Sequence, residues 1–222
     1  FNPAAHLSVT PEFLDASITR LKADGHVPVA LEDLPEYLAR TDQPGPAMVF
    51  TLDDGYRDND LYARPVFEKH GVPYTIFIAG GFVDRTHSIW WETAELLINQ
   101  LDEFTFDYGS GDVTVPTRNL AHSQPEQMRA EISLSAERVA EITGETPSTF
   151  AYPYGDRCAA GPREYQAAQD LGFKVAVTTN PGVLQTKSLQ DLFSLRRISL
   201  NGYYQKCRYV AALASGIPFA LS

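Results

Sequence analysis

The stretch that decides the fold is AMVFTLDDGY, residues 47–56. Residues 47–52 form a mostly apolar run of the length expected for a strand that is buried on both faces. Two acids, Asp53 and Asp54, follow this run, and Gly55 permits a sharp change in chain direction. The stretch therefore predicts a buried strand that ends at a pair of carboxylates.

Strands and helices are expected to alternate on both sides of this stretch. Apolar residues at helical spacing predict helices over residues 10–24, 34–40, 61–70, 90–101, 124–143 and 162–171. Short apolar runs predict strands over residues 27–31, 47–53, 74–79, 148–152, 174–179 and 193–200. This order predicts an α/β fold, with a mostly parallel sheet or barrel whose working residues gather at the carboxyl ends of the strands. We expect one domain over residues 1–222, with a hairpin insertion near residues 103–117.

The amino-acid composition limits the kinds of partner that the chain is expected to bind. The chain has 222 residues, a formal charge of −10 and 44% hydrophobic residues, which is typical of an ordinary globular protein. The acidic balance argues against nucleic acid or an anionic membrane as the main partner. No apolar run reaches the roughly 20 residues of a membrane span, and FNPAAHLSVTPEF lacks the pattern of a signal peptide. A cytoplasmic location is expected, and the oligomeric state stays open.

The acid pair suggests metal-assisted chemistry. Adjacent carboxylates repel each other unless a cation or a shared proton relieves them, so one acid can bind a metal while the other acts as a base. The alternative is an Asp-Asp pair that caps a strand-to-helix loop. A phosphatase of the haloacid dehalogenase type is disfavoured, because its two acids are separated by one residue.

A second motif, FAYPYGD at residues 150–156, also follows a predicted strand. Pro153 and Gly155 predict a tight turn whose backbone N–H groups can point into a cavity and stabilise an oxyanion. The alternative is an aromatic turn packed on the core.

Several segments together resemble the polysaccharide deacetylases of the NodB-homology type, carbohydrate esterase family 4. The resemblance covers most of residues 7–200, and the segments that carry it are TLDDGYRDN, GVPYTIFIAGGFV, PEQMRAEISLSAERVAEITGETP, FAYPYGD and REYQAAQDLGFKVAVTTNPGV. It implies a distorted (β/α)7-type barrel and the metal-dependent, most often zinc-dependent, removal of an N- or O-acetyl group from a carbohydrate polymer.

The resemblance also implies roles for individual residues. Asp53 would be the general base, Asp54 a metal ligand, and the backbone N–H of Tyr154 a donor to the tetrahedral oxyanion. Tyr152 and Pro153 of the turn motif are also expected to bind substrate. Apart from the resemblance, Trp90 and the adjacent Trp91 can form an aromatic platform for a sugar ring, and the alternative for this pair is a place in the core or in a lid.

The sequence departs from the family pattern at the metal site. The family takes two histidines from an H-S/T-x-x-H motif, and this chain has none: its histidines are His6, His26, His70, His87 and His122. His87 and His122 are the spare candidates as ligands, with ordinary surface positions as the alternative. The expected strand is also missing before residue 124, so we hypothesise that a segment carrying that strand and both histidines is absent between about residues 117 and 118.

Two further departures concern other catalytic groups. Ala151 occupies the position where the family often has an arginine that orients the base, and the strand LRRISL at residues 195–200 lacks the Leu-x-His of the general acid. Arg196 or Arg197 can supply a positive charge instead, or can form a solvent-facing salt bridge. Two other functions therefore stay open: an inactive member that binds a glycan or a partner protein, and a metal-independent amidase.

Overall fold

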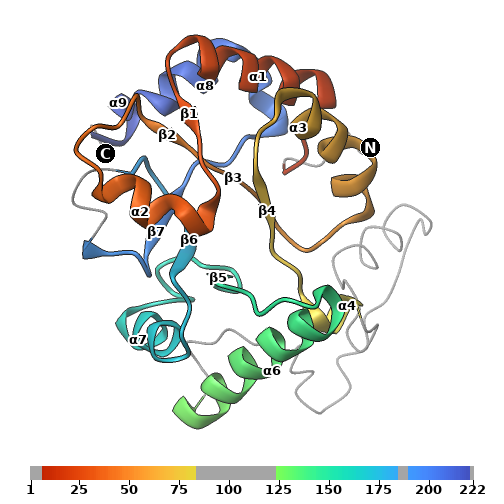
Figure 1. Ribbon diagram of the computed structural model, residues 1–222, viewed down its shortest axis with the longest axis vertical. Coiled ribbons are helices and arrows are strands. Elements are labelled where there is room, and N and C mark those ends of the chain that lie inside the picture. Colours follow the sequence, from red (N-terminus) through yellow and green to blue (C-terminus); the bar gives the residue numbers. More distant parts are fainter. Residues whose placement is uncertain (1–6, 84–123, 185–189, 221–222) are drawn as a thin grey trace, which may run out of the picture.

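The computed structural model describes residues 7–83, 124–184 and 190–220 (Figure 1). The helices are α1 (Pro11–Ala23), α2 (Leu34–Ala39), α3 (Arg64–His70), α4 (Gly80–Val83), α6 (Pro125–Thr143), α7 (Pro162–Asp170), α8 (Cys207–Ala214) and α9 (Ile217–Ala220). The strands are β1 (Val27–Pro28), β2 (Ala47–Met48), β3 (Phe50–Leu52), β4 (Tyr74–Ile76), β5 (Thr149–Ala151), β6 (Val175–Pro181) and β7 (Leu195–Arg197).

Each hydrogen-bonded pair of described strands is parallel. The pairs are β1 with β2, β3 with β4, β5 with β6, and β6 with β7. The predicted α/β fold with a parallel sheet is therefore confirmed. Over the described ranges the strands form sheets of two, two and three strands, which do not close into a ring.

Local signals in the sequence explain where several elements begin and end. Helix α1 begins after Thr10, whose side-chain oxygen accepts a hydrogen bond from the N–H of Phe13 at 3.1 Å. Helices α3 and α6 end at Gly71 and Gly144, both in the left-handed conformation that glycine adopts without strain.

Three apolar clusters fill the space between the sheets and helices. One joins α1, α3 and α8, a second joins α6 and α7 to β5 and β6, and a third packs α2 against β6 and β7. Helices α1 and α8, from the two ends of the chain, lie side by side at one end of the molecule, and α6 lies at the other end (Figure 1). The clusters hold the strands in place, and with them the residues at the carboxyl ends of the strands.

Several strands and helices begin or end at residues other than those expected from the sequence. The strand predicted over 47–53 is divided into β2 and β3, and the strand predicted over 193–200 is confined to β7. The helix predicted over 61–70 begins with a π-helical turn at Asn59–Ala63. Helices α8 and α9 were not predicted.

Other predictions lie outside the described residues: the helix over 90–101, the hairpin near 103–117 and the missing segment near 117–118. None of the helices within the described ranges is long and apolar enough to cross a membrane.

Candidate active site

The two acids lie at the point where β3 ends. Asp54 has a φ of 67° and Gly55, which follows it, also has a φ of 67°. Among the described residues, the only non-glycine residues with positive φ are Asp54 and Tyr154. Positive φ is strained for an L-residue, and such strain is concentrated at functional sites. Both strained residues follow the carboxyl end of a strand.

The turn after β5 repeats this backbone arrangement. Tyr154 has a φ of 61° and Gly155 a φ of 59°, and the N–H of Gly155 donates to the carbonyl of Pro153 at 2.7 Å. A Cβ atom at Gly155 would lie 3.0 Å from the nitrogen of Thr179 and 3.0 Å from the carbonyl oxygen of Tyr152. Both φ and the available space therefore require glycine here.

Arg197, the last residue of β7, binds the first acid. Its Nη1 lies 2.8 Å from Oδ1 and 2.9 Å from Oδ2 of Asp53. Its Nε donates to the carbonyl of Thr178 at 2.9 Å, which fixes the plane of the guanidinium. Of the two arginines that the sequence left open, the structure brings Arg197 to the acid pair. The other, Arg196, packs against Gly182.

Strand β6 connects this ion pair to the second motif. The hydroxyl of Thr179 donates to the carbonyl of Tyr154 at 2.7 Å, and the N–H of Thr179 donates to the carbonyl of Gly155 at 2.9 Å. Because Thr178 holds Arg197, a continuous set of hydrogen bonds runs from the acid pair after β3, through β7 and β6, to the turn after β5. Two motifs about 100 residues apart are thereby held in one network.

The two acids, Asp53 and Asp54, have different electrostatic surroundings. Burial is the main cause that raises the pKa of Asp54, and the negative charge of Asp53 raises it further, while the positive charge of Arg197 partly opposes both. The ionised form of Asp54 is therefore disfavoured until another cation approaches. Such a carboxylate is a suitable oxygen ligand for a divalent metal.

The described residues do not complete a metal site. Within them, no group of three or more His, Cys, Asp or Glu side chains is placed to hold an ion. His26 lies on the carbonyl of Leu21 and His70 on the carboxylate of Asp15, so neither approaches Asp54. His6, His87 and His122 lie outside the described residues, and the two cysteines are free thiols.

The predicted substrate-binding residues differ in how far they are exposed to solvent. Tyr152 is buried in the core, and its hydroxyl donates to the carbonyl of Phe193 at 2.9 Å. Its side chain therefore anchors the turn to the core. The side chains of Pro153 and Tyr154 are exposed on the turn. Trp90 lies outside the described residues.

Comparisons with known proteins agree on one family. A family model described as polysaccharide deacetylase matches residues 40–176. Over 201 residues the chain is 24% identical to YxkH of Bacillus subtilis (strain 168), whose name marks it provisionally as a polysaccharide deacetylase. That match covers 88% of this chain and 66% of YxkH, so the chain spans just under two thirds of the length of this curated relative.

Two solved structures have a similar fold. The Streptococcus pyogenes deacetylase PplD in complex with acetate has a TM-score of 0.70 at 19% identity, covering 95% of this chain and 89% of PplD. IcaB from Ammonifex degensii has a TM-score of 0.65 at 20% identity, covering 93% of this chain and 90% of IcaB. At sequence identities this low, the structural similarity shows that this chain shares their fold and shows nothing more.

The first prediction concerns the turn after β5. Gly155→Ala should lower the free energy of unfolding by about 2–3 kcal/mol, because it adds a left-handed alanine and a contact with backbone atoms. Gly172→Ala is the matched control: its φ is also positive, at 88°, but its Cβ would meet nothing within 4 Å, so a loss of about 1 kcal/mol is expected. Urea unfolding measures both, and equal losses would contradict the packing argument.

The second prediction concerns pH. The pKa of Asp54 is raised in the folded protein, so the metal-free protein loses stability as the pH rises from the ordinary range of a carboxyl through that raised pKa. In the presence of a chelator, Asp54→Asn should therefore raise the free energy of unfolding at pH 7 by a fraction of a kcal/mol, since the carboxyl is only half-buried.

This gain should vanish below the ordinary pKa of aspartate, where both side chains are neutral. Asp42→Asn should have the opposite sign at pH 7, because the bond from Arg40 lowers the pKa of Asp42. Thermal unfolding across the pH range checks both signs. A loss of stability in Asp54→Asn at pH 7 would show that the burial argument fails.

Proposed function

The chain belongs to the polysaccharide deacetylase family, and from this premise we propose that it hydrolyses acetyl groups from an N-acetylated polysaccharide or oligosaccharide. The observation that carries the proposal is the acid pair after β3, in which Asp54 has a positive φ and Asp53 is tied by Arg197 to the network that ends at the Tyr154 turn. The acetate in the structurally similar PplD is consistent with acetyl chemistry in this fold. We further propose that the three sheets belong to one distorted (β/α)7 barrel.

In this proposal Asp53 is the general base. Its side chain is 48% exposed, so water can reach it, while both of its oxygens are held by Arg197. A carboxylate in a fixed orientation can remove the proton from a water molecule as the oxygen attacks the acetyl carbon. Arg197 is a positioning residue, because it acts on the reaction through Asp53.

The backbone N–H of Tyr154 is proposed to stabilise the oxyanion. Within the described residues this N–H donates no hydrogen bond, whereas the carbonyl of Tyr154 is fixed by Thr179. A preorganised N–H donor can stabilise the charge that develops on the acetyl oxygen in the tetrahedral intermediate. The strained φ of Tyr154 is the backbone cost of presenting that donor.

A divalent metal, for which zinc is the expected ion, is proposed to bind at Asp54. When bound, it would polarise the acetyl carbonyl and lower the pKa of a water molecule. Among the described residues we assign Asp54 as a ligand, and further ligands would have to complete the site, since no group of three or more His, Cys, Asp or Glu side chains is placed there to hold an ion. The pKa of Asp54, raised by burial and by Asp53, is the reason to expect a cation beside it.

The third prediction tests the base. With chitin oligosaccharides, the chain should release acetate in the presence of zinc, and Asp53→Asn should lower kcat by about 100-fold or more, because it removes general-base catalysis. Asp33→Asn, an exposed acid before α2, is the control and should retain activity.

The same assay separates the alternatives. Acetate release that a chelator leaves unchanged would favour the metal-independent amidase. A wild-type chain that releases no acetate from acetylated glycans with any divalent metal would favour the inactive binding protein.

The fourth prediction tests Arg197. Arg197→Gln should lower kcat by about 10- to 100-fold with a smaller change in KM, because it leaves Asp53 in several orientations. Arg197→Lys should restore part of the loss, since one cation remains but the planar fork is gone. Arg196→Gln is the matched neighbour and should behave as wild type. A similar loss for both glutamine variants would show that Arg197 has no special role in positioning the base.

A further inference from the structure

A group of tyrosines follows the strand that supplies Arg197. Tyr203 and Tyr204 are 66% and 59% exposed, unusually high values for aromatic side chains. The ring centroids of Tyr203 and Tyr204 are 6.4 Å apart, and those of Tyr204 and Tyr209 are 5.6 Å apart, both pairs edge to face. We call Tyr203, Tyr204 and Tyr209 the tyrosine surface.

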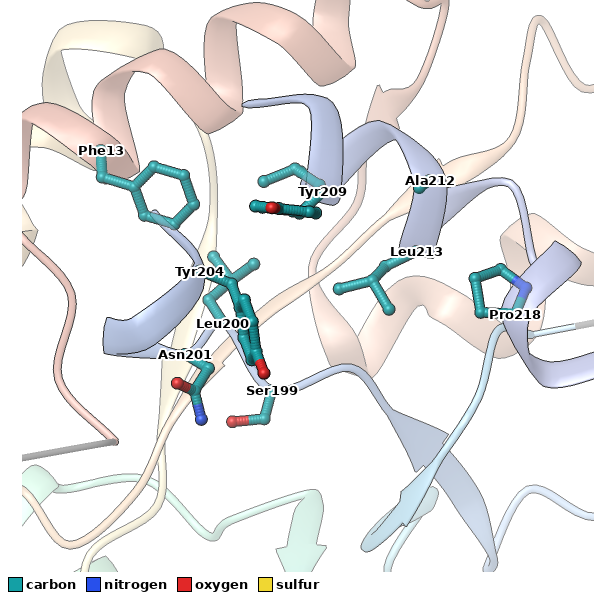
Figure 2. A pocket seen from close by; sticks show the side chains of 10 residues that line it. Phe13, Ser199, Leu200, Asn201, Tyr204, Tyr209, Ala212, Leu213 and Pro218 are labelled. Carbon is teal, nitrogen blue, oxygen red and sulfur yellow. The ribbon is translucent and has the colours of Figure 1, made fainter. Parts of the chain in front are cut away.

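A pocket of about 270 Å³ opens beside the tyrosine surface (Figure 2). Its walls are the rings of Tyr204 and Tyr209 and the apolar side chains of Phe13, Leu200, Leu213 and Pro218. In Figure 2 the polar tips of Ser199, Asn201 and Tyr204 point toward the same edge of the pocket. An apolar wall with a polar edge fits a ligand that has an apolar face and hydroxyl groups around it.

The tyrosine surface is close to the proposed catalytic residues along the chain. Tyr203 is six residues after Arg197, so an extended chain separates their Cα atoms by at most about 20 Å. The chain leaves β7 at its carboxyl end, the end at which Arg197 holds Asp53. A polymer that places one acetyl group at Asp53 can therefore reach the tyrosine surface with another of its units.

The local charge differs from that of the whole protein. The chain has a net charge of −10, yet no acidic residue lines the pocket. The guanidinium of Arg208 lies 4.9 Å from the centre of the Tyr209 ring, and Lys206 is two residues before it in the chain. These two cations disfavour a positively charged ligand on this surface.

We propose that the tyrosine surface and its pocket form a subsite for a neutral, still acetylated sugar unit of the same glycan. The inference rests on the proposed function and deepens it. The apolar face of the sugar ring would contact the tyrosines, and its hydroxyls would meet the polar edge. A unit that has lost its acetyl group carries an ammonium at neutral pH, so Arg208 and Lys206 would reject it.

The fifth prediction tests the subsite by binding, in the full chain carrying Asp53→Asn so that the ligand is not consumed. Isothermal titration with the hexamer of N-acetylglucosamine should give a Kd about 10-fold weaker when Tyr203→Ala and Tyr204→Ala are added, because two aromatic contacts are lost. Binding of the dimer should not change, since it is too short to occupy both sites.

Two variants serve as controls. Tyr203→Phe with Tyr204→Phe should keep most of the hexamer affinity, because the ring faces remain. Leu171→Ala removes an exposed apolar side chain just after α7, where the chain leads toward the amino end of β6, and should have no effect. The deacetylated glucosamine hexamer should bind more weakly than the acetylated one, and Arg208→Gln should narrow that difference.

The outcomes distinguish this inference from the proposed function. Loss of hexamer binding in the alanine variant supports the subsite even when the wild type releases no acetate. Unchanged hexamer binding overturns the subsite even when acetate is released. Binding of a medium-chain fatty acid, with none of the hexamer, would also overturn it and would identify the pocket as an acyl site.

Discussion

The ion pair between Arg197 and Asp53 is the contact on which the site depends. It joins the sheet of β3 and β4 to the sheet of β5, β6 and β7, with Nη1 of Arg197 on both oxygens of Asp53 and Nε on the carbonyl of Thr178. The Arg197 side chain is only 18% exposed, so the pair is shielded from water on the arginine side. A planar group with fixed donors suits this task better than a flexible ammonium.

The same contact explains why the acid pair still favours a further cation. Arg197 lies nearest Asp53, and its positive charge lowers the pKa of Asp54 less than burial and the neighbouring carboxylate raise it. One internal cation therefore balances one of two acids. The strained φ values at Asp54 and Tyr154 belong to the same arrangement, since each directs a residue out of a strand end and each is followed by a glycine of positive φ.

Much of this arrangement could be predicted from sequence, because it follows from local patterns. The apolar run before Asp53 and the glycines after Asp54 and Tyr154 predict strands that end abruptly. Contacts between distant segments were harder to predict. Arg196 and Arg197 are adjacent in a strand, so their side chains point to opposite faces. Leu195, which is buried, shares a face with Arg197, and this was the only signal in the strand that favoured Arg197 as the residue near the acids. Tyr152 gave no signal that it lies in the core, since an aromatic residue in a turn motif fits either place.

If the chain acts on a glycan as proposed, the cations beside the tyrosine surface would affect the order in which a polymer is processed. In the proposed reaction an amine is released next to Asp53, and this amine becomes an ammonium at neutral pH. Arg208, close to the tyrosine surface, disfavours that same ammonium. A glycan that binds both regions would therefore keep acetylated units over the tyrosines and present the next reactive unit to Asp53. On this argument, the spacing of the two regions along the polymer, rather than the acid pair alone, would decide which acetyl group the proposed reaction removes.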